Sequence, residues 1–423
     1  MTMVNAYDPA AGDLLASADR ALIARRARAL GPAYRLFYQR PLHLVRGEGV
    51  WLYSANGERY LDAYNNVAAV GHCHPRVVAA IAGQAATLAT HTRYLDATIV
   101  AYAERLVATL PPPLAHVMFT CTGSEANDLA LRMARARVGR GVIVTSNAYH
   151  GVTELLAGMS PSLGPDVPLH PFVRSVAPPG HDEPDAAVRF ASRVAAAADE
   201  LAAAGHGPAV LLLDTILSSD GVLGGPAGVI APAVAATRAA GGLFIADEVQ
   251  AGLGRVGPSF WGFCHHGVAP DLVTCGKPMG NGYPVAMVAC RTDLAQAFGK
   301  VRYFNTFGGN AVAAAAGIAV LDVIDDERLA SNAAAVGDDI RAALADLSDR
   351  TGAIANVRGT GLAIAADCPT PTAASTLVNR LRDRGVLISA TGADGRTLKI
   401  RPPLPFAAEH ADQLVSCLAD VLR

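Results

Sequence analysis

Short apolar runs alternate with longer amphipathic stretches through the middle of the chain. Five runs, "GVIVT", "PAVLLLD", "GLFIAD", "DLVTC" and "PVAMVAC", are almost wholly apolar and fall between residues 141 and 290. Helical periodicity fills most of the stretches between them. Strands that are apolar on both faces are typical of a mainly parallel sheet covered by helices on both sides. The pattern therefore predicts an α/β fold.

The first hundred residues follow other patterns. Residues 13–30, "DLLASADRALIARRARAL", have the apolar spacing of a helix, which Gly31-Pro32 should end. The stretch "GVWLYSANGERYLDA" predicts a hairpin that turns at Asn56-Gly57. A buried strand, "AHVMFT", is expected before the helix of "SEANDLALRMARAR". Further helices are expected at 75–91 and 98–110, and over the alanine tracts 195–204 and 311–320.

These elements divide the chain into three parts. We expect an N-terminal arm and hairpin in residues 1–60, which contribute to a small domain. A large domain built on the parallel sheet should follow in residues 61–315, and a smaller α+β domain in residues 316–423. A chain of 423 residues is long enough for a deep core and an enclosed pocket.

Composition excludes several classes of protein. Hydrophobic residues make up 51% of the chain, but no run is long enough to span a membrane. The first forty residues lack an apolar segment behind a basic start, so the expected compartment is the reducing cytoplasm. Seven cysteines without CxxC or Cys/His pairs predict neither a disulfide framework nor a metal site. A net charge of −2 gives no reason to expect nucleic acid or an acidic membrane as partner.

Lysine is rare in this chain. Lys277, Lys300 and Lys399 are the only lysines among 35 basic residues, and all the others are arginine. A desolvated lysine can lose its proton and become a nucleophile, whereas arginine stays charged. Lys277 lies in the glycine-rich loop "TCGKPMGNG" between two apolar runs. It is therefore a candidate catalytic amine, the alternative being a chance surface lysine.

Two more polar clusters follow predicted strands. In "FTCTGSEAND", Gly123 and Ser124 open a helix whose free amides can hold an anion, although an ordinary serine N-cap would look the same. In "LFIADEVQAGLGR", Asp247 ends an apolar strand and either pairs with a cation or caps a helix, and Gln250 can reach the same ligand. An anion cradle, a carboxylate and a lysine at adjacent strand ends fit pyridoxal 5′-phosphate.

The chain resembles class III pyridoxal-phosphate enzymes, the ω-aminotransferase-like branch of fold type I. The resemblance runs from "GEGVWLYSANGERYLDAYNNVAAVGHCHPRVV" through "TGSEAND", "AYHG", "ADEVQAGLGR" and "GKPMGNGYPVA" to "NTFGGN" and "VRGTGL". It implies the fold type I pyridoxal-phosphate transferase fold, with Lys277 carrying the cofactor as a Schiff base and Asp247 pairing with the ring nitrogen. This family acts on small amines and amino acids.

The same resemblance assigns further residues to the cofactor. It implies that Tyr149 of "AYHG" stacks on the ring, that Gln250 bonds the 3-hydroxyl, and that Gly123 and Ser124 hold the phosphate. It also implies that Thr306 of "NTFGGN" reaches that phosphate from the other subunit, so we expect a homodimer or a higher homo-oligomer.

Two positions depart from the common aminotransferase pattern. Many class III enzymes bind a substrate carboxylate with an arginine and gate it with a glutamate. Here "LKIRPPL" places Lys399 at the arginine and "LDTILSSDG" places Ser219 at the glutamate. An ammonium is a compact point charge that also suits a phosphate, although Lys399 could simply lie on a surface strand. With "NNVAAVGHCHP", "TRYL" and "YFNTFGGN", the pattern resembles the ethanolamine-phosphate phospho-lyase group.

Three hypotheses follow from these residues. The leading one is a phospho-lyase that eliminates phosphate from a small phosphorylated amine and gives an aldehyde and ammonia. The second is an aminotransferase that moves an amino group from an amine or ω-amino acid to a keto acid. The third, a silent cofactor-binding scaffold, conflicts with the intact Lys277 and Asp247. In the arm "GPAYRLFYQR", Tyr38 and Arg35 are candidate substrate contacts, or else surface residues of the dimer.

Overall fold

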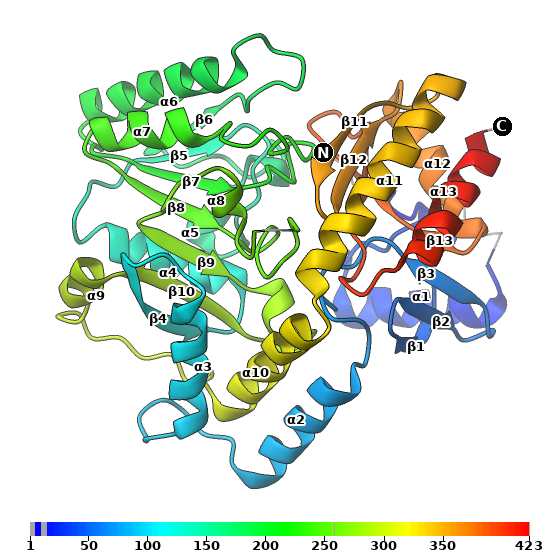
Figure 1. The fold of residues 1–423 in the computed structure, drawn as a ribbon, viewed down its shortest axis with the longest axis horizontal. Helices are drawn as coiled ribbons and strands as arrows, with labels where there is room; N and C mark the ends of the chain where they lie inside the picture. The colour runs from blue at the N-terminus through cyan, green and yellow to red at the C-terminus, as the bar shows by residue number, and fades with distance from the viewer. Residues whose placement is uncertain (1–4, 10–14, 258, 423) are drawn as a thin grey trace.

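The computed structural model describes residues 5–9, 15–257 and 259–422. Figure 1 shows a large sheet with its helices in one half of the molecule and two smaller sheets in the other. The helices α10, Ala311–Asp326, and α11, Leu329–Thr351, run between the two halves. None of the helices in these described ranges is both long and apolar enough to cross a membrane.

The large sheet has seven strands in the described part of the chain, in the order β4-β10-β9-β8-β7-β5-β6. β10 runs antiparallel to β4 and β9, and every pair from β9 to β6 is parallel. The predicted mainly parallel sheet is therefore confirmed. Its strands are β4 Leu114–Thr120, β5 Val142–Thr145, β6 Val173–Val176, β7 Val210–Asp214, β8 Leu243–Asp247, β9 Leu272–Cys275 and β10 Ala286–Arg291.

Both faces of the central strands of this sheet are buried, which explains why those strands are almost wholly apolar. In β7, Leu211 and Leu213 pack into one apolar cluster with residues of α6 and α7. Val210 and Leu212, one position out of phase, pack into a second cluster with residues of α4 and α9. The helices that cover the two faces are α4 Gly123–Ala134, α6 Ala186–Ala203, α7 Ala231–Ala239 and α9 Thr292–Phe298.

The two smaller sheets combine distant parts of the chain. The predicted hairpin is confirmed as β2 and β3, which pair antiparallel between β1 and β13. β13 comes from the C-terminal region and pairs parallel with β3. The other sheet has the order β11-β12-β15-β14. The strands are β1 Leu44–Glu48, β2 Trp51–Ser54, β3 Arg59–Asp62, β11 Ala355–Thr360, β12 Ala363–Asp367, β13 Val386–Leu387, β14 Ser389–Thr391 and β15 Thr397–Ile400.

Among the remaining helices, the three nearest the N-terminus agree with the predicted ones to within a few residues, and the others were not predicted from the sequence. The first, α1, ends at Leu30, where Gly31 has a φ of 72°; residues 13 and 14 of its predicted start lie outside the described residues. The helix expected to reach residue 91 ends at Thr87 instead, because Leu88 is extended. These helices are α1 Ser17–Leu30, α2 Pro75–Thr87, α3 Ala97–Ala108, α5 Glu154–Ala157, α8 Gly262–His265, α12 Pro371–Asp383 and α13 Ala408–Leu422, with single turns η2 Pro161–Leu163 and η3 Lys277–Gly280.

Candidate active site

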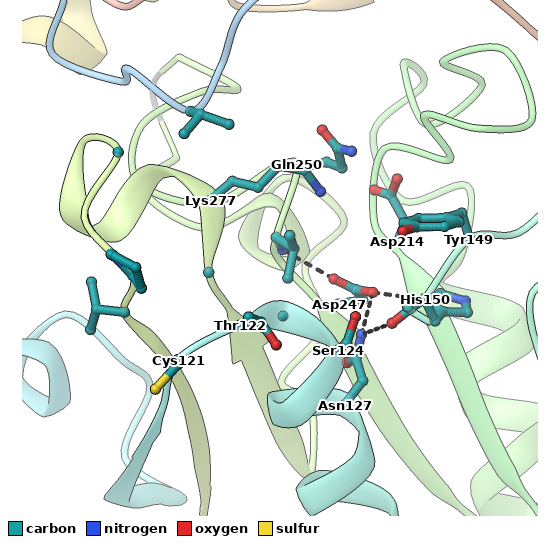
Figure 2. A pocket seen from close by; sticks show the side chains of 18 of the residues that line it. Cys121, Thr122, Ser124, Asn127, Tyr149, His150, Asp214, Asp247, Gln250 and Lys277 are labelled. Carbon is teal, nitrogen blue, oxygen red and sulfur yellow. Dashed lines mark hydrogen bonds and ion pairs between the residues drawn. The ribbon is translucent and has the colours of Figure 1, made fainter. Parts of the chain in front are cut away.

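A pocket of about 350 Å³ lies at the carboxyl edge of the large sheet. Ligands of open parallel sheets bind at this edge. The strands β7 and β8 end at Asp214 and Asp247, and β9 ends two residues before Lys277. All three of these side chains line the pocket (Figure 2). The structure also brings the following predicted residues to its wall: Gly123, Ser124, Tyr149 and Gln250.

Lys277 begins the single turn η3 in a loop that is tied to another part of the chain. Asn281, which ends this turn with a φ of 49°, accepts from the amide of Val70 (3.0 Å) and donates to the carbonyl of Gly71 (2.8 Å). Burial lowers the pKa of the Lys277 ammonium, and the nearby Arg401 guanidinium lowers it further. Both effects favour the neutral amine, which is the nucleophilic and basic form.

Asp247 is held by three donors at the floor of the pocket. Its Oδ2 accepts from Asn127 Nδ2 and from His150 Nδ1, both at 2.8 Å, and its Oδ1 accepts from the amide of Val249 at 3.1 Å (Figure 2). Asn127 is oriented in turn by the hydroxyl of Thr274, which donates to its Oδ1 at 2.6 Å. Within the described residues no lysine or arginine forms an ion pair with this carboxylate, so its charge is available to a cationic ligand group.

Asn127 and His150 were not singled out in the sequence, although both lie inside the quoted motifs "TGSEAND" and "AYHG". Both side chains are almost completely buried. A buried carboxylate at a strand end requires hydrogen-bond donors. The polar residues Asn127 and His150 in these motifs could therefore have been proposed as the donors to Asp247 from the sequence.

The N-terminus of α4 forms a cradle for an anion. Thr122 caps the helix by accepting from the amide of Glu125 at 3.1 Å, and the Glu125 carboxylate accepts from the amide of Cys121 at 2.7 Å. The first amides of the helix, which begins at Gly123, face the pocket without an intrahelical partner. A Cβ on Gly123 would lie only 2.9 Å from Val249 Cγ2, so this wall has no room for a larger residue.

Two buried basic side chains lie behind the pocket wall, on the strand β15 and directly after it, and neither is among the residues that line the pocket. Lys399 and Arg401 are 9% and 5% exposed, and being two residues apart they point to the same side. Arg401 donates from Nη1 to Gln250 Oε1 and from Nε to the carbonyl of Tyr64 (3.4 Å). Within the described residues, neither cation forms an ion pair with a carboxylate. Arg401 is a residue that the sequence reasoning missed.

The low dielectric around this pair affects the protonation of Lys399. Burial holds the pKa of the Lys399 ammonium well below its usual range, and Arg401 and Lys277 lower it further. Asp214 and Asp220 act in the opposite direction. A bound anion would restore the charged form, since an opposite charge nearby raises the pKa of an ammonium.

Four other predicted residues lie away from the pocket wall. The Tyr38 hydroxyl is buried and donates to the carbonyl of Ile388 (3.1 Å), so it does not point into the pocket. Arg35 is exposed at the surface of the N-terminal arm. Thr306 is exposed, and Ser219 contributes its backbone carbonyl to a bond with Asn147 Nδ2. The idea that Tyr38 and Arg35 line the substrate pocket therefore finds no support in the geometry of this chain.

Comparison with known proteins identifies the family. A model of the family "Aminotransferase class-III" matches residues 37–422, nearly the whole chain. The chain belongs to the class III aminotransferase family. This confirms the predicted fold type I architecture and the predicted use of pyridoxal phosphate, because class III aminotransferases depend on that cofactor.

Relatives within the family carry two kinds of name. The chain is 38% identical to "Alanine--glyoxylate aminotransferase 2-like" of Drosophila melanogaster, over 94% of this chain and 87% of that protein. It is 35% identical to "Ethanolamine-phosphate phospho-lyase homolog 1" of Caenorhabditis elegans, over 95% and 93%. Among solved structures, a phospholyase from Arthrobacter in complex with phosphoethanolamine is 44% identical with a TM-score of 0.92, over 95% of this chain and 99% of that one.

The residues of the pocket fit the family's cofactor. The α4 cradle supplies amides and the Ser124 hydroxyl for a phosphate, and the missing Cβ of Gly123 lets Val249 pack against the start of this helix. The buried Asp247 carboxylate suits a protonated ring nitrogen, and the Lys277 amine suits the aldehyde carbon. The pocket therefore offers a partner for each of these three parts of the cofactor.

Proposed function

We propose that this class III enzyme is a phospho-lyase acting on a small phosphorylated amine such as ethanolamine phosphate. In the reaction, a proton leaves the carbon that bears the nitrogen and the C–O bond on the neighbouring carbon breaks. Phosphate departs with the electron pair of that bond. The remaining vinylic amine takes up water, so the products are an aldehyde, ammonia and phosphate.

The observation that carries this proposal is the pair of buried basic side chains Lys399 and Arg401, neither of which forms an ion pair with a carboxylate of the described residues. A buried charge is costly unless it is paired, and a phosphate dianion would pair both cations at once. A gating glutamate would compete for them, but this chain has Ser219 at that position. The phosphoethanolamine bound by the similar Arthrobacter phospholyase supports the same substrate class.

The pocket residues divide the chemistry between them. When bound, pyridoxal phosphate supplies an electron sink for the pair left by the broken C–H bond. We propose that Lys277 Nζ carries the cofactor and moves that proton, because its lowered pKa makes a neutral amine available. With the cofactor bound, Asp247 would hold the proton on the ring nitrogen, Gly123 and Ser124 would hold the phosphate, and Tyr149 would cover the ring, since all four residues line the pocket.

A direct assay tests the proposal. Purified enzyme with ethanolamine phosphate and no keto acid is expected to release phosphate, ammonia and aldehyde in equal amounts. An aminotransferase, which the name of the Drosophila melanogaster relative favours, would need a keto acid and would release no phosphate. Amino transfer to pyruvate or glyoxylate without phosphate release would therefore overturn the phospho-lyase assignment.

Replacing Lys399 tests the phosphate contact. Lys399→Ala should remove a charge-assisted bond worth about 1.5–3 kcal/mol and raise KM for a phosphorylated amine about ten- to a hundredfold. An unphosphorylated amine should be affected much less, because it brings no anion to the site. Lys399→Arg should recover part of the binding. Equal losses for phosphorylated and plain amines would show that Lys399 is structural.

We further propose that the enzyme is a homodimer in which Thr306 contacts the cofactor phosphate of the other subunit. Thr306 is exposed and lies off the pocket wall of its own chain, and Phe307 beside it is 72% exposed. Thr306→Ala should weaken cofactor binding several-fold, about what one hydrogen bond contributes. In dimers mixed from Thr306→Ala and Lys277→Ala chains, the site that keeps Lys277 should receive an intact Thr306 from the other chain and bind the cofactor as tightly as wild type. Weakened cofactor binding at that site would refute the arrangement.

A further inference from the structure

The side-chain amide of Gln250 has a fixed orientation in the pocket wall. Its Oε1 accepts from Asn66 Nδ2 at 3.0 Å and also from Arg401 Nη1. An arginine can only donate, so the atom that faces it must be the amide oxygen. The Gln250 nitrogen has no partner among the described residues, which leaves its two N–H groups as donors to a ligand in the pocket.

Arg401 is itself held in place at several points. Its backbone amide donates to the carbonyl of Ala63 at 2.7 Å, and its Nε to the carbonyl of Tyr64. The guanidinium carbon lies 5.2 Å from the centre of the Tyr64 ring. These contacts hold a charged donor against Gln250 in a site where little water competes, and a charged donor polarises the amide it binds.

We propose that Arg401 is a positioning residue for the cofactor. By holding Gln250 Oε1 it turns the amide N–H groups toward the ring 3-oxygen, and its charge strengthens their donation to that oxygen. Arg401 therefore acts on the electronic state of the cofactor through Gln250, before any substrate is bound. This role does not depend on the phospho-lyase assignment, because it concerns the substrate-free enzyme.

Other charged groups surround Arg401 and could mimic such an effect by charge alone. The titratable and charged groups that interact with it electrostatically are Asp62, Tyr64, Asp214, Arg255, Lys277 and Lys399. Among them Lys399 is a control for the loss of a buried basic side chain from the same segment, since it makes no bond to Gln250, although its lowered pKa means that its replacement removes little charge. The effect of charge is separated from the Arg401–Gln250 bond by Arg401→Lys, which keeps the charge, and by a double-mutant cycle with Gln250.

The test uses the cofactor-loaded enzyme without substrate. Arg401→Met should raise the Kd for pyridoxal phosphate about three- to tenfold, the effect of one hydrogen bond. It should also move the midpoint of the pH-dependent change in the cofactor's absorption to higher pH by about half a unit to one unit, because the negative ring oxygen loses a donor. Arg401→Lys, which keeps the charge, should restore part of both changes.

A double-mutant cycle decides the mechanism. In a Gln250→Leu background, Arg401→Met should produce no further shift of the midpoint, whereas additive shifts would refute a path through Gln250. Lys399→Met should shift the midpoint by less than about a third of the shift in Arg401→Met, because Lys399 makes no bond to Gln250. Equal shifts in both variants, or an unchanged midpoint in Arg401→Met, would overturn the proposal. Should Arg401→Met not fold, Arg401→Gln, which can still donate to Tyr64, replaces it in the cycle.

Discussion

Lys277→Ala is expected to abolish turnover, with a loss of at least about 10²–10⁴-fold from the missing proton transfer alone. The same variant also loses the amine that should hold the cofactor, and no other lysine lies in the pocket wall of the described chain. The measurement is phosphate or keto-acid turnover by the purified, folded variant, together with its cofactor absorption band. The change in that band on addition of an amine substrate should disappear along with activity.

Lys300→Ala is the matched control for this experiment. Lys300 is an exposed lysine that is not part of the pocket wall, so its loss should leave turnover unchanged. A Lys277→Ala enzyme that kept a substantial fraction of the wild-type rate would show that the catalytic base lies elsewhere, whichever of the two reactions the enzyme performs.

Asp247→Ala is expected to lower the rate by about 10²–10³-fold, as removal of a buried electrostatic partner does in other active sites. It should also weaken cofactor binding. A ring nitrogen without a carboxylate beside it loses its proton and becomes a poor electron sink. The measurements are kcat and the Kd for pyridoxal phosphate. A wild-type kcat together with a wild-type Kd would contradict the role of Asp247 as partner of the ring nitrogen.

Asp247→Asn separates chemistry from packing. Alanine leaves Asn127 and His150 without their acceptor, which could cost about 1–3 kcal/mol of folding free energy, whereas asparagine keeps the shape of the side chain. Activity should stay low in Asp247→Asn while the melting temperature stays near wild type. Recovery of activity in this variant would mean that Asp247 acts by packing alone.

The elements that could be predicted are those whose own residues show a clear pattern of apolar and polar positions. Strands such as "LFIAD" could be recognised because both of their faces are buried, so every position is apolar. Asp247 and Lys277 could be singled out because a charged side chain that follows an apolar strand is costly to bury unless it has a partner. The edge that brings their side chains together follows from the parallel order of the strands.

The missed elements have no such local signature. β6, "VRSV", is short and only half apolar, because it lies at the edge of the sheet. β13 has two residues and exists through its pairing with β3. Arg401 could not be distinguished among 32 arginines, since what sets it apart is contact with Gln250 and Tyr64, which are remote in the chain. Function at such positions depends on tertiary neighbours alone.

The parallel pair of β3 and β13 has a consequence for how the protein is made. Leu61 pairs with Val386, so the edge of the N-terminal sheet cannot be completed until nearly all of the chain has left the ribosome. Contacts between such distant residues close large loops and slow folding. Until then, β3 presents an unpaired strand edge, which is a template for association with other chains. Nascent copies of this enzyme should therefore depend on chaperones that shield that edge during synthesis.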